Sequence, residues 1–301
     1  MTQSLFKPYL AIVVGVIAVS FSAILVRYSE AESGVIAFYR MLFSCLILIP
    51  YFCREAVKEI GRINKKDWVL CAAAGAFLAF HFIFWFESLR YTSVANSTVL
   101  VTMQPIFAFL GTYFLFKERV SIGGVVSIIV AISGSILISA SDFSHNKGAL
   151  FGDVLALVAC ALATAYFLIG QMVRKRMGLT AYTFIVYGIS AIILLIYVLG
   201  SGQELFDYPK KEWYLFILLA IIPTLLGHSL FNWAIEWVSA TKISMAILFE
   251  PIGAAVLAYF LFNESLSAIQ LFGASLVLVG LSLFILMNRR RDAIENSEVN
   301  Y

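Results

Sequence analysis

An internal repeat constrains the fold of this chain more than any other feature of its sequence. When the sequence is shifted by 146 positions, Pro105–Glu118 lies on Pro251–Glu264, and the same register carries Gly134 onto Gly280 without a gap. Self-similarity at a fixed spacing is the signature of a duplicated structural unit. The chain is therefore expected to consist of two copies of one unit.

The composition indicates the solvent in which that unit folds. Apolar residues make up 61% of the chain and charged residues 13%, against about half and about a quarter in soluble proteins. We therefore expect an integral membrane protein. The four cysteines show no CxxC spacing, so neither a disulfide framework nor a zinc site is expected. The basic residues sit in short connections between apolar runs, and binding to nucleic acid is not expected.

Ten segments are long and apolar enough to cross a membrane, which takes about 20 residues per helix. Each copy holds five, and an odd number of crossings makes the second copy enter the membrane in the opposite sense. The predicted fold is an all-α integral membrane protein whose ten transmembrane helices form two inverted five-helix repeats. The first repeat is assigned to residues 1–141, the second to 149–288 and a cytoplasmic tail to 289–301. The expected helices cover residues 8–27, 34–53, 67–89, 94–116, 122–141, 149–173, 179–200, 213–236, 241–262 and 267–287.

The distribution of lysine and arginine predicts the orientation. The N-terminus, the connections after the even-numbered helices and the tail carry fifteen of the 21 basic residues, the opposite connections carry five, and Arg40 lies inside a helix. Cytoplasmic connections are enriched in Lys and Arg. Both termini of this multi-pass protein of the cell (inner) membrane are therefore expected to be cytoplasmic.

Glu250 is the first candidate for a functional site. It lies near mid-depth of the ninth helix and precedes Pro251, which leaves the carbonyl four residues back without its hydrogen bond. A carboxylate in a broken helix is a common element of transporter sites, although a protonated Glu beside a simple kink would give the same sequence. The repeat places neutral Gln104, followed by Pro105, at the equivalent position.

Arg40 lies inside the second helix and cannot readily lose its proton. Ionisable groups within the membrane are costly and normally face a cavity or a partner. The structural interpretation is an ion pair with Glu87 or Glu32, or a side chain that extends to the membrane surface. A substrate carboxylate as the partner is the functional alternative.

Histidines occur in the equivalent third and eighth helices. His228, Asn232 and Glu236 recur at i, i+4 and i+8, and His81 has Trp85 one turn on. Such stripes are expected to face the interior of the bundle. No further ligand stands at a metal-binding spacing from either histidine, so no metal site is predicted. Glu118 and Glu264 recur at the ends of the fourth and ninth helices, where we expect structural turns.

Several of these residues together resemble the drug/metabolite transporter superfamily, EamA branch, over about residues 8–287. The resemblance implies ten helices, cytoplasmic termini and a central cavity lined by helices 1, 3, 4, 6, 8 and 9. It implies transport of small metabolites such as amino acids, often outward. Arg40 lies outside that lining, which weakens its case, but its charge keeps it among the candidates. The motifs that carry the resemblance are Tyr91–Ala95 leading to Gln104-Pro105 and Glu118, Val238–Thr241 leading to Glu250-Pro251 and Glu264, Arg40, and Gly152–Leu157. The cavity residues that it implies are Ser22, His81, Trp85, Gln104, Tyr166, His228, Asn232 and Glu250.

The predicted function is a secondary transporter that exports small amphipathic metabolites or drug-like compounds by alternating access. Loss of hydration at mid-depth disfavours the charged form of a carboxyl group, so Glu250 is the candidate for proton coupling. A membrane-embedded enzyme acting on a lipid or lipid-linked substrate is the alternative, but the sequence has no HExxH motif and no intramembrane aspartate pair. A channel is disfavoured because no helix carries a ring of like charges. No catalytic residue and no cofactor are predicted. The expected partners are a small-molecule substrate and the lipid bilayer, and a homodimer is left open.

Overall fold

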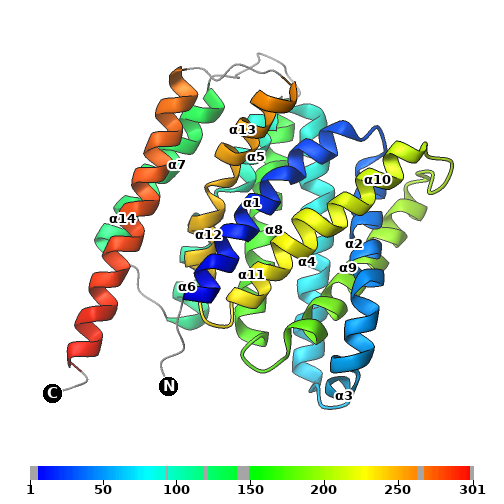
Figure 1. The fold of residues 1–301 in the computed structure, drawn as a ribbon, viewed down its shortest axis with the longest axis horizontal. Coiled ribbons are helices and arrows are strands. Elements are labelled where there is room, and N and C mark those ends of the chain that lie inside the picture. Colours follow the sequence, from blue (N-terminus) through cyan, green and yellow to red (C-terminus); the bar gives the residue numbers. More distant parts are fainter. Residues whose placement is uncertain (1–5, 93, 118–120, 141–148, 263–267, 299–301) are drawn as a thin grey trace.

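The computed structural model describes residues 6–92, 94–117, 121–140, 149–262 and 268–298, and all regular structure in these ranges is helical (Figure 1). Glu118 and Glu264, for which turns were expected, lie outside the described residues. The first repeat contains α1 (Phe6–Tyr28), α2 (Ser33–Tyr51), the π-helix η1 (Phe52–Ala56), α3 (Val57–Ile60), α4 (Lys65–Tyr91), α5 (Val94–Val101), α6 (Gln104–Phe116) and α7 (Ile122–Ala140). The second contains α8 (Ala149–Val173), α9 (Leu179–Gly200), α10 (Lys210–Leu219), the π-helix η2 (Ala220–His228), α11 (Ser229–Ala234), α12 (Ala240–Ile247), α13 (Glu250–Phe262) and α14 (Ala268–Glu298).

The helices form the ten expected membrane segments. Within the described ranges, eight helical stretches are long and apolar enough to cross a membrane, and two shorter apolar stretches, Ile122–Leu137 and Leu271–Phe284, lie in α7 and α14. These ten stretches correspond one to one with the segments expected from the sequence. The prediction of an all-α membrane protein with ten helices in two repeats is confirmed.

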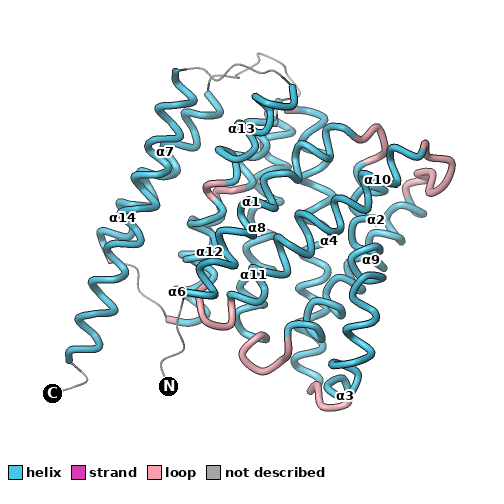
Figure 2. Tube along the Cα trace, in the orientation of Figure 1, coloured by secondary structure: helices cyan, strands magenta, loops and turns pink. Residues whose placement is uncertain are grey.

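The fourth and ninth segments are both broken at a proline. α5 ends at Val101 and α6 begins at Gln104, directly before Pro105. The same break separates α12 from α13, where Pro251 is the second residue of α13, and Figure 2 shows this break as a short loop. In the first repeat, Pro105 cannot donate to the carbonyl of Val101, and the side-chain amide of Gln104 donates to that oxygen instead, at 3.5 Å. The break expected from the two proline positions is present in both repeats.

Helices of one repeat pack mainly on helices of the other. α2 packs against α9, α4 against α8, α1 against η2 and α11, and α7 against α14. Each of these contacts crosses from the first repeat to the second. The two repeats therefore form a common core, and α7 and α14 stand side by side at one edge of it (Figure 1).

The α7–α14 contact brings two helix backbones together at repeat-related glycines. A Cβ atom at Gly134 would lie 2.5 Å from the carbonyl oxygen of Gly273, and one at Gly280 would lie 2.6 Å from the amide nitrogen of Ala131. Neither position has room for a side chain. Small residues allow such close approach where lipid gives helices no hydrophobic drive to associate.

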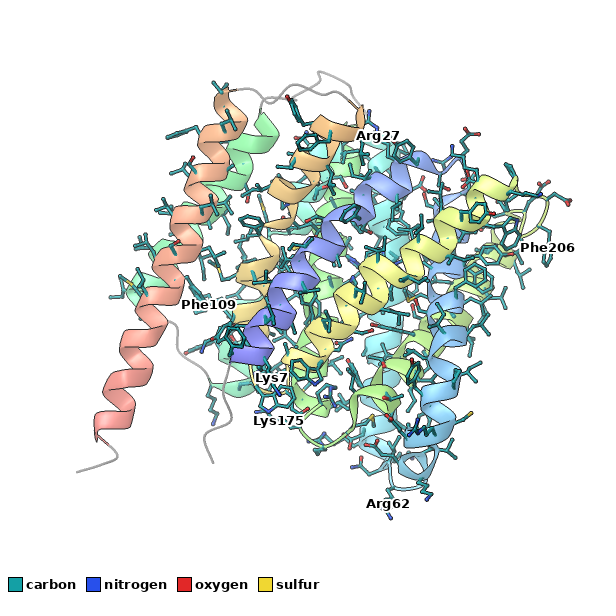
Figure 3. The ribbon with its side chains drawn as sticks, viewed as in Figure 1. Lys7, Arg27, Arg62, Phe109, Lys175 and Phe206 are labelled. Carbon is teal, nitrogen blue, oxygen red and sulfur yellow. The ribbon has the colours of Figure 1, made fainter. Side chains whose placement is uncertain are left out.

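Basic residues gather at one end of the bundle. Figure 3 shows Lys7, Arg62 and Lys175 toward the same end, and Arg27 toward the opposite end. The predicted orientation assigns the end that carries more basic residues to the cytoplasm.

Candidate functional site

A small cavity with buried walls lies where the two repeats meet. All twelve lining residues are buried. The space open to the centre of a water-sized sphere is about 20 Å³, which is room for about one or two water molecules. In this conformation the space is smaller than a metabolite. Its lining consists of Val19, Ser22, Arg40, His81, Trp85, Val101, Gln104, Phe167, His228, Phe231, Ile247 and Glu250.

Both helix breaks open onto this cavity. Val101 and Gln104, the residues on either side of the first break, belong to the lining, as do Ile247 and Glu250 on either side of the second. Residues at equivalent positions of the two repeats thus face one space. The break that each proline creates is a feature of the site as well as of the fold.

Arg40 contributes to the lining although the resemblance placed it outside. Its side chain is fully buried. Nε donates to Oγ1 of Thr224 at 2.7 Å, Nη1 donates to Oγ of Ser22 at 2.9 Å, and the guanidinium carbon lies 4.2 Å from the centre of the Phe82 ring. Nη2 has no hydrogen-bond partner within the described part of the chain. α2 is not among the helices expected to line the cavity, but it can supply this group because the arginine side chain is long enough to extend its charge to the cavity.

The glutamates suggested as partners of Arg40 pair with another arginine. Glu32 lies 2.5 Å and Glu87 3.6 Å from Nη1 of Arg90, at the end of α4. No ion pair within the described ranges joins Arg40 to a carboxylate. The expectation of a structural ion pair with Glu32 or Glu87 was therefore wrong.

Thr224, which sequence reasoning missed, positions the guanidinium. It follows Pro223 in η2, and that proline cannot donate to the carbonyl of Leu219, four residues back. The Thr224 hydroxyl donates to this carbonyl at 2.9 Å and accepts from Arg40. The signal was available in the sequence, because Pro223 lies inside an apolar segment and is followed directly by the polar residue Thr224.

Glu250 lies on α13 at the wall of the same cavity as Arg40. It is the only carboxyl group among the twelve lining residues. The cavity therefore combines the permanent cation of Arg40 with one carboxyl group, beside the two histidines.

The two histidines meet at the cavity. Their ring centres lie 6.5 Å apart. Nδ1 of His81 lies 2.9 Å from the carbonyl oxygen of Ala159, and because a carbonyl only accepts, this nitrogen carries the proton. His228 stacks on Phe167 with ring centres 6.0 Å apart, and its Nδ1 has no partner in the described part of the chain. The described residues contain no group of three or more His, Cys, Asp or Glu that could hold a metal ion.

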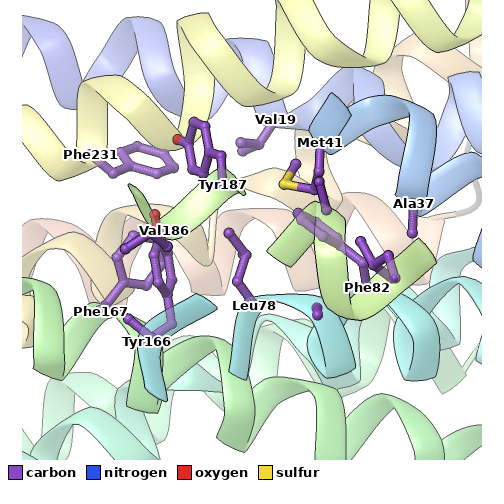
Figure 4. Close-up of a cluster of buried hydrophobic side chains, with 14 of the residues drawn as sticks. Val19, Ala37, Met41, Leu78, Phe82, Tyr166, Phe167, Val186, Tyr187 and Phe231 are labelled. Carbon is purple, nitrogen blue, oxygen red and sulfur yellow. The ribbon is translucent and has the colours of Figure 1, made fainter. Parts of the chain in front are cut away.

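Tyr166 and Asn232, also predicted as cavity residues, are absent from the lining. The side-chain amide of Asn232 donates to the hydroxyl of Tyr166 and, at 3.5 Å, to that of Tyr187, which lies 3.0 Å from Oγ of Ser229. Figure 4 shows Tyr166 beside Phe167, and it is Phe167 that reaches the cavity. These residues form a polar layer next to the site.

The end of α8 is tied to its neighbours by Arg174. Its side chain is 3% exposed, Nε donates to the carbonyl of Asn232 at 2.9 Å, Nη1 donates to that of Met177, and Nη2 lies 2.7 Å from the carboxylate of Glu236. Burial lowers the pKa of Arg174, and the charge of Glu236 opposes this effect. This cluster stands at the end of the bundle that carries Lys175 (Figure 3).

A contact between the two repeats lies at the opposite end of the bundle. Glu212, on α10, accepts from the hydroxyl of Ser29 and, at 3.2 Å, from the backbone N–H of Glu30. Glu32 pairs with Arg90 there, as described above.

Comparison with known proteins assigns both repeats to one family. The model of the EamA-like transporter family matches residues 6–140 and again residues 150–286. A protein of Archaeoglobus fulgidus described as an "Uncharacterized transporter" is 25% identical over 270 residues, covering 90% of this chain and 93% of its own length. "Uncharacterized transporter YxxF" of Bacillus subtilis is 24% identical over 260 residues, covering 85% and 82%. A solved structure described as "Crystal structure of protein" superposes with a TM-score of 0.78 at 16% identity, covering 95% of this chain and 99% of that one, which shows the fold alone.

Proposed function

The chain belongs to the EamA-like transporter family, and from that premise we propose that it exports small amphipathic metabolites, such as amino acids or drug-like compounds, across the cell membrane by alternating access. The observation that carries this proposal is the buried cavity at the two helix breaks. Discontinuous helices that meet near mid-depth at the interface of inverted repeats are the usual site of secondary transporters.

The lining has the mixed character that such substrates require. Phe167, Phe231 and Trp85 supply aromatic surface, while Arg40 and Glu250 supply charge. Binding sites for small molecules are commonly apolar with a few placed polar groups that fix orientation. We assign proton coupling to Glu250, because it is the only carboxyl group of the lining.

Uptake into proteoliposomes tests the proposal. Purified protein is expected to move at least one member of a panel of amino acids and metabolites faster than protein-free liposomes, and with saturation. Ile247→Trp, which fills the cavity, should stop this flux, whereas Ile106→Trp on the exposed face of α6 should not. If the panel shows no flux with or without a pH gradient, the transport proposal loses its support. Lipid turnover by the same preparation, abolished by His81→Ala or His228→Ala, would instead favour the enzyme alternative.

We further propose that both termini are cytoplasmic, on the charge distribution and its grouping at one end. Ser201 and Lys65 are exposed in connections assigned to opposite sides, and Cys53 is the only exposed native cysteine in the described part of the chain. In a Cys53→Ser background, Ser201→Cys is expected to react with a membrane-impermeant maleimide in intact cells. Lys65→Cys is expected to react only after permeabilisation. The reverse pattern would overturn the orientation.

A further inference from the structure

Arg40 places a permanent positive charge at the wall of the cavity. A guanidinium keeps its proton in proteins, and an unpaired charge out of water is strongly unfavourable. Two arginines near the ends of the bundle each have a carboxylate within 4 Å, namely Arg90 with Glu32 and Arg174 with Glu236. Among the described residues, Arg40 has none.

The guanidinium is held so that one of its nitrogens remains available. Thr224 accepts from Nε and Ser22 accepts from Nη1, while the Phe82 ring covers one face. Of these two acceptors, Ser22 lines the cavity and Thr224 does not. Nη2 is buried and has no hydrogen-bond partner among the described residues. Two hydrogen bonds and a ring contact therefore fix the group and leave one donor edge unused, as in a binding site prepared for an acceptor.

Building on the proposed transport function, we infer that Arg40 is the residue that recognises the substrate, and that the substrate carries a carboxylate bound by Nη2. The cavity has space of about 20 Å³, enough for a small head group, while the aromatic residues Trp85, Phe167 and Phe231 surround it. The apolar part of the substrate must displace or open these side chains. The substrate class is thus a small organic carboxylate with an apolar body.

Glu250 does not replace such a ligand. It lines the same cavity, but no ion pair within 4 Å joins it to Arg40 among the described residues. The two groups lie on different helices, α2 and α13, and a bound carboxylate would contact Arg40 while leaving Glu250 free to hold a proton. A substrate that also carries an ammonium group would place it at Glu250.

The test compares carboxylates with their neutral isosteres on the wild-type protein. Thermal shift and calorimetry in detergent, at one pH and one salt concentration, use benzoate, phenylacetate and 3-phenylpropionate, each with its amide. At least one carboxylate should raise the unfolding temperature by mass action. Its amide should bind more weakly by about tenfold or more, because hydrogen bonds between charged groups are stronger than those to neutral groups. Equal binding of acid and amide, or no binding by any of the three acids, would overturn the inference. Phenylalanine, which carries both charged groups, shows whether an ammonium group strengthens binding of the carboxylate. Phenethylamine shows whether the ammonium group alone is sufficient. Tighter binding of phenethylamine than of the carboxylates would also overturn the inference.

Variants place the effect at Arg40. Arg40→Gln should lose discrimination between acid and amide, Arg40→Lys should recover part of it, and Arg90→Gln, an exposed arginine at the end of α4, should behave like wild type. If Arg40→Gln does not fold, the comparison of acid and amide on the wild type still decides. Flux measurements distinguish failure of the carboxylate site from failure of the transport proposal. If wild type and Arg40→Gln transport a substrate without an oxyanion at equal rates, the protein is a transporter but Arg40 does not recognise a substrate carboxylate.

Discussion

Replacing Glu250 with Gln is expected to abolish the acceleration of transport by an imposed pH gradient while substrate exchange across the membrane continues. Glutamine keeps the shape of the side chain and can still form hydrogen bonds, but it cannot release a proton. One unit of pH difference supplies about 1.4 kcal/mol per proton, which corresponds to about tenfold in an accumulation ratio. The wild-type protein should show accumulation approaching this ratio, and Glu250→Gln should only equilibrate.

The measurement is uptake into proteoliposomes with and without the gradient, at equal protein content. Glu87→Gln is the matched control, because Glu87 lies outside the cavity lining and is close to Arg90. It should respond to the gradient as the wild type does. A full response of Glu250→Gln would show that the protein works without proton coupling at this residue and would leave a facilitator.

Replacing Arg174 with Ala is expected to lower the free energy of unfolding by about 2–4 kcal/mol, the range for losing buried hydrogen bonds to a charged group. The buried guanidinium joins the ends of α8 and α11 through two backbone carbonyls and Glu236. Removing it leaves both carbonyls without their donor, and it also removes packed hydrocarbon. Thermal unfolding in detergent, followed by tryptophan fluorescence, measures the loss.

Lys175→Ala is the control, since this neighbouring residue is exposed and surface substitutions usually change stability by less than about 0.5 kcal/mol. Equal unfolding temperatures for Arg174→Ala and the wild type would mean that other contacts hold this end of the bundle. Glu236→Gln should have a smaller effect than Arg174→Ala, because the carbonyl contacts of the guanidinium remain.

The sequence predicted the parts of the fold that depend on local chemistry. Ten apolar segments and the repeat suffice for the helix count, since each helix satisfies its own backbone in lipid. The two breaks followed from Pro105 and Pro251, because a proline removes a specific hydrogen bond wherever it stands in a helix. These features need no knowledge of which helices are neighbours.

The site was harder to predict because it depends on how far each side chain extends from its helix and on its position along the helix axis. The stripe His228, Asn232 and Glu236 advances about 6 Å along the helix at each step. His228 therefore reaches the cavity, Asn232 lies in the next layer, and Glu236 lies at the end of the bundle with Arg174. Arg40 was matched with the wrong carboxylates because spacing along the chain does not show that Arg90 stands nearer to them.

The hydrogen bond between Arg40 and Thr224 also has a consequence for biosynthesis. The two residues are 184 positions apart, and at roughly 5–20 residues per second the ribosome needs about 10–40 s to pass from one to the other. During that interval α2 carries a charged side chain in the membrane, with Ser22 already made and the second repeat still missing. A chain whose synthesis stops before Thr224 cannot form the hydrogen bond between Arg40 and Thr224. Such a fragment is expected to be recognised and degraded by membrane quality control rather than to persist as half a transporter.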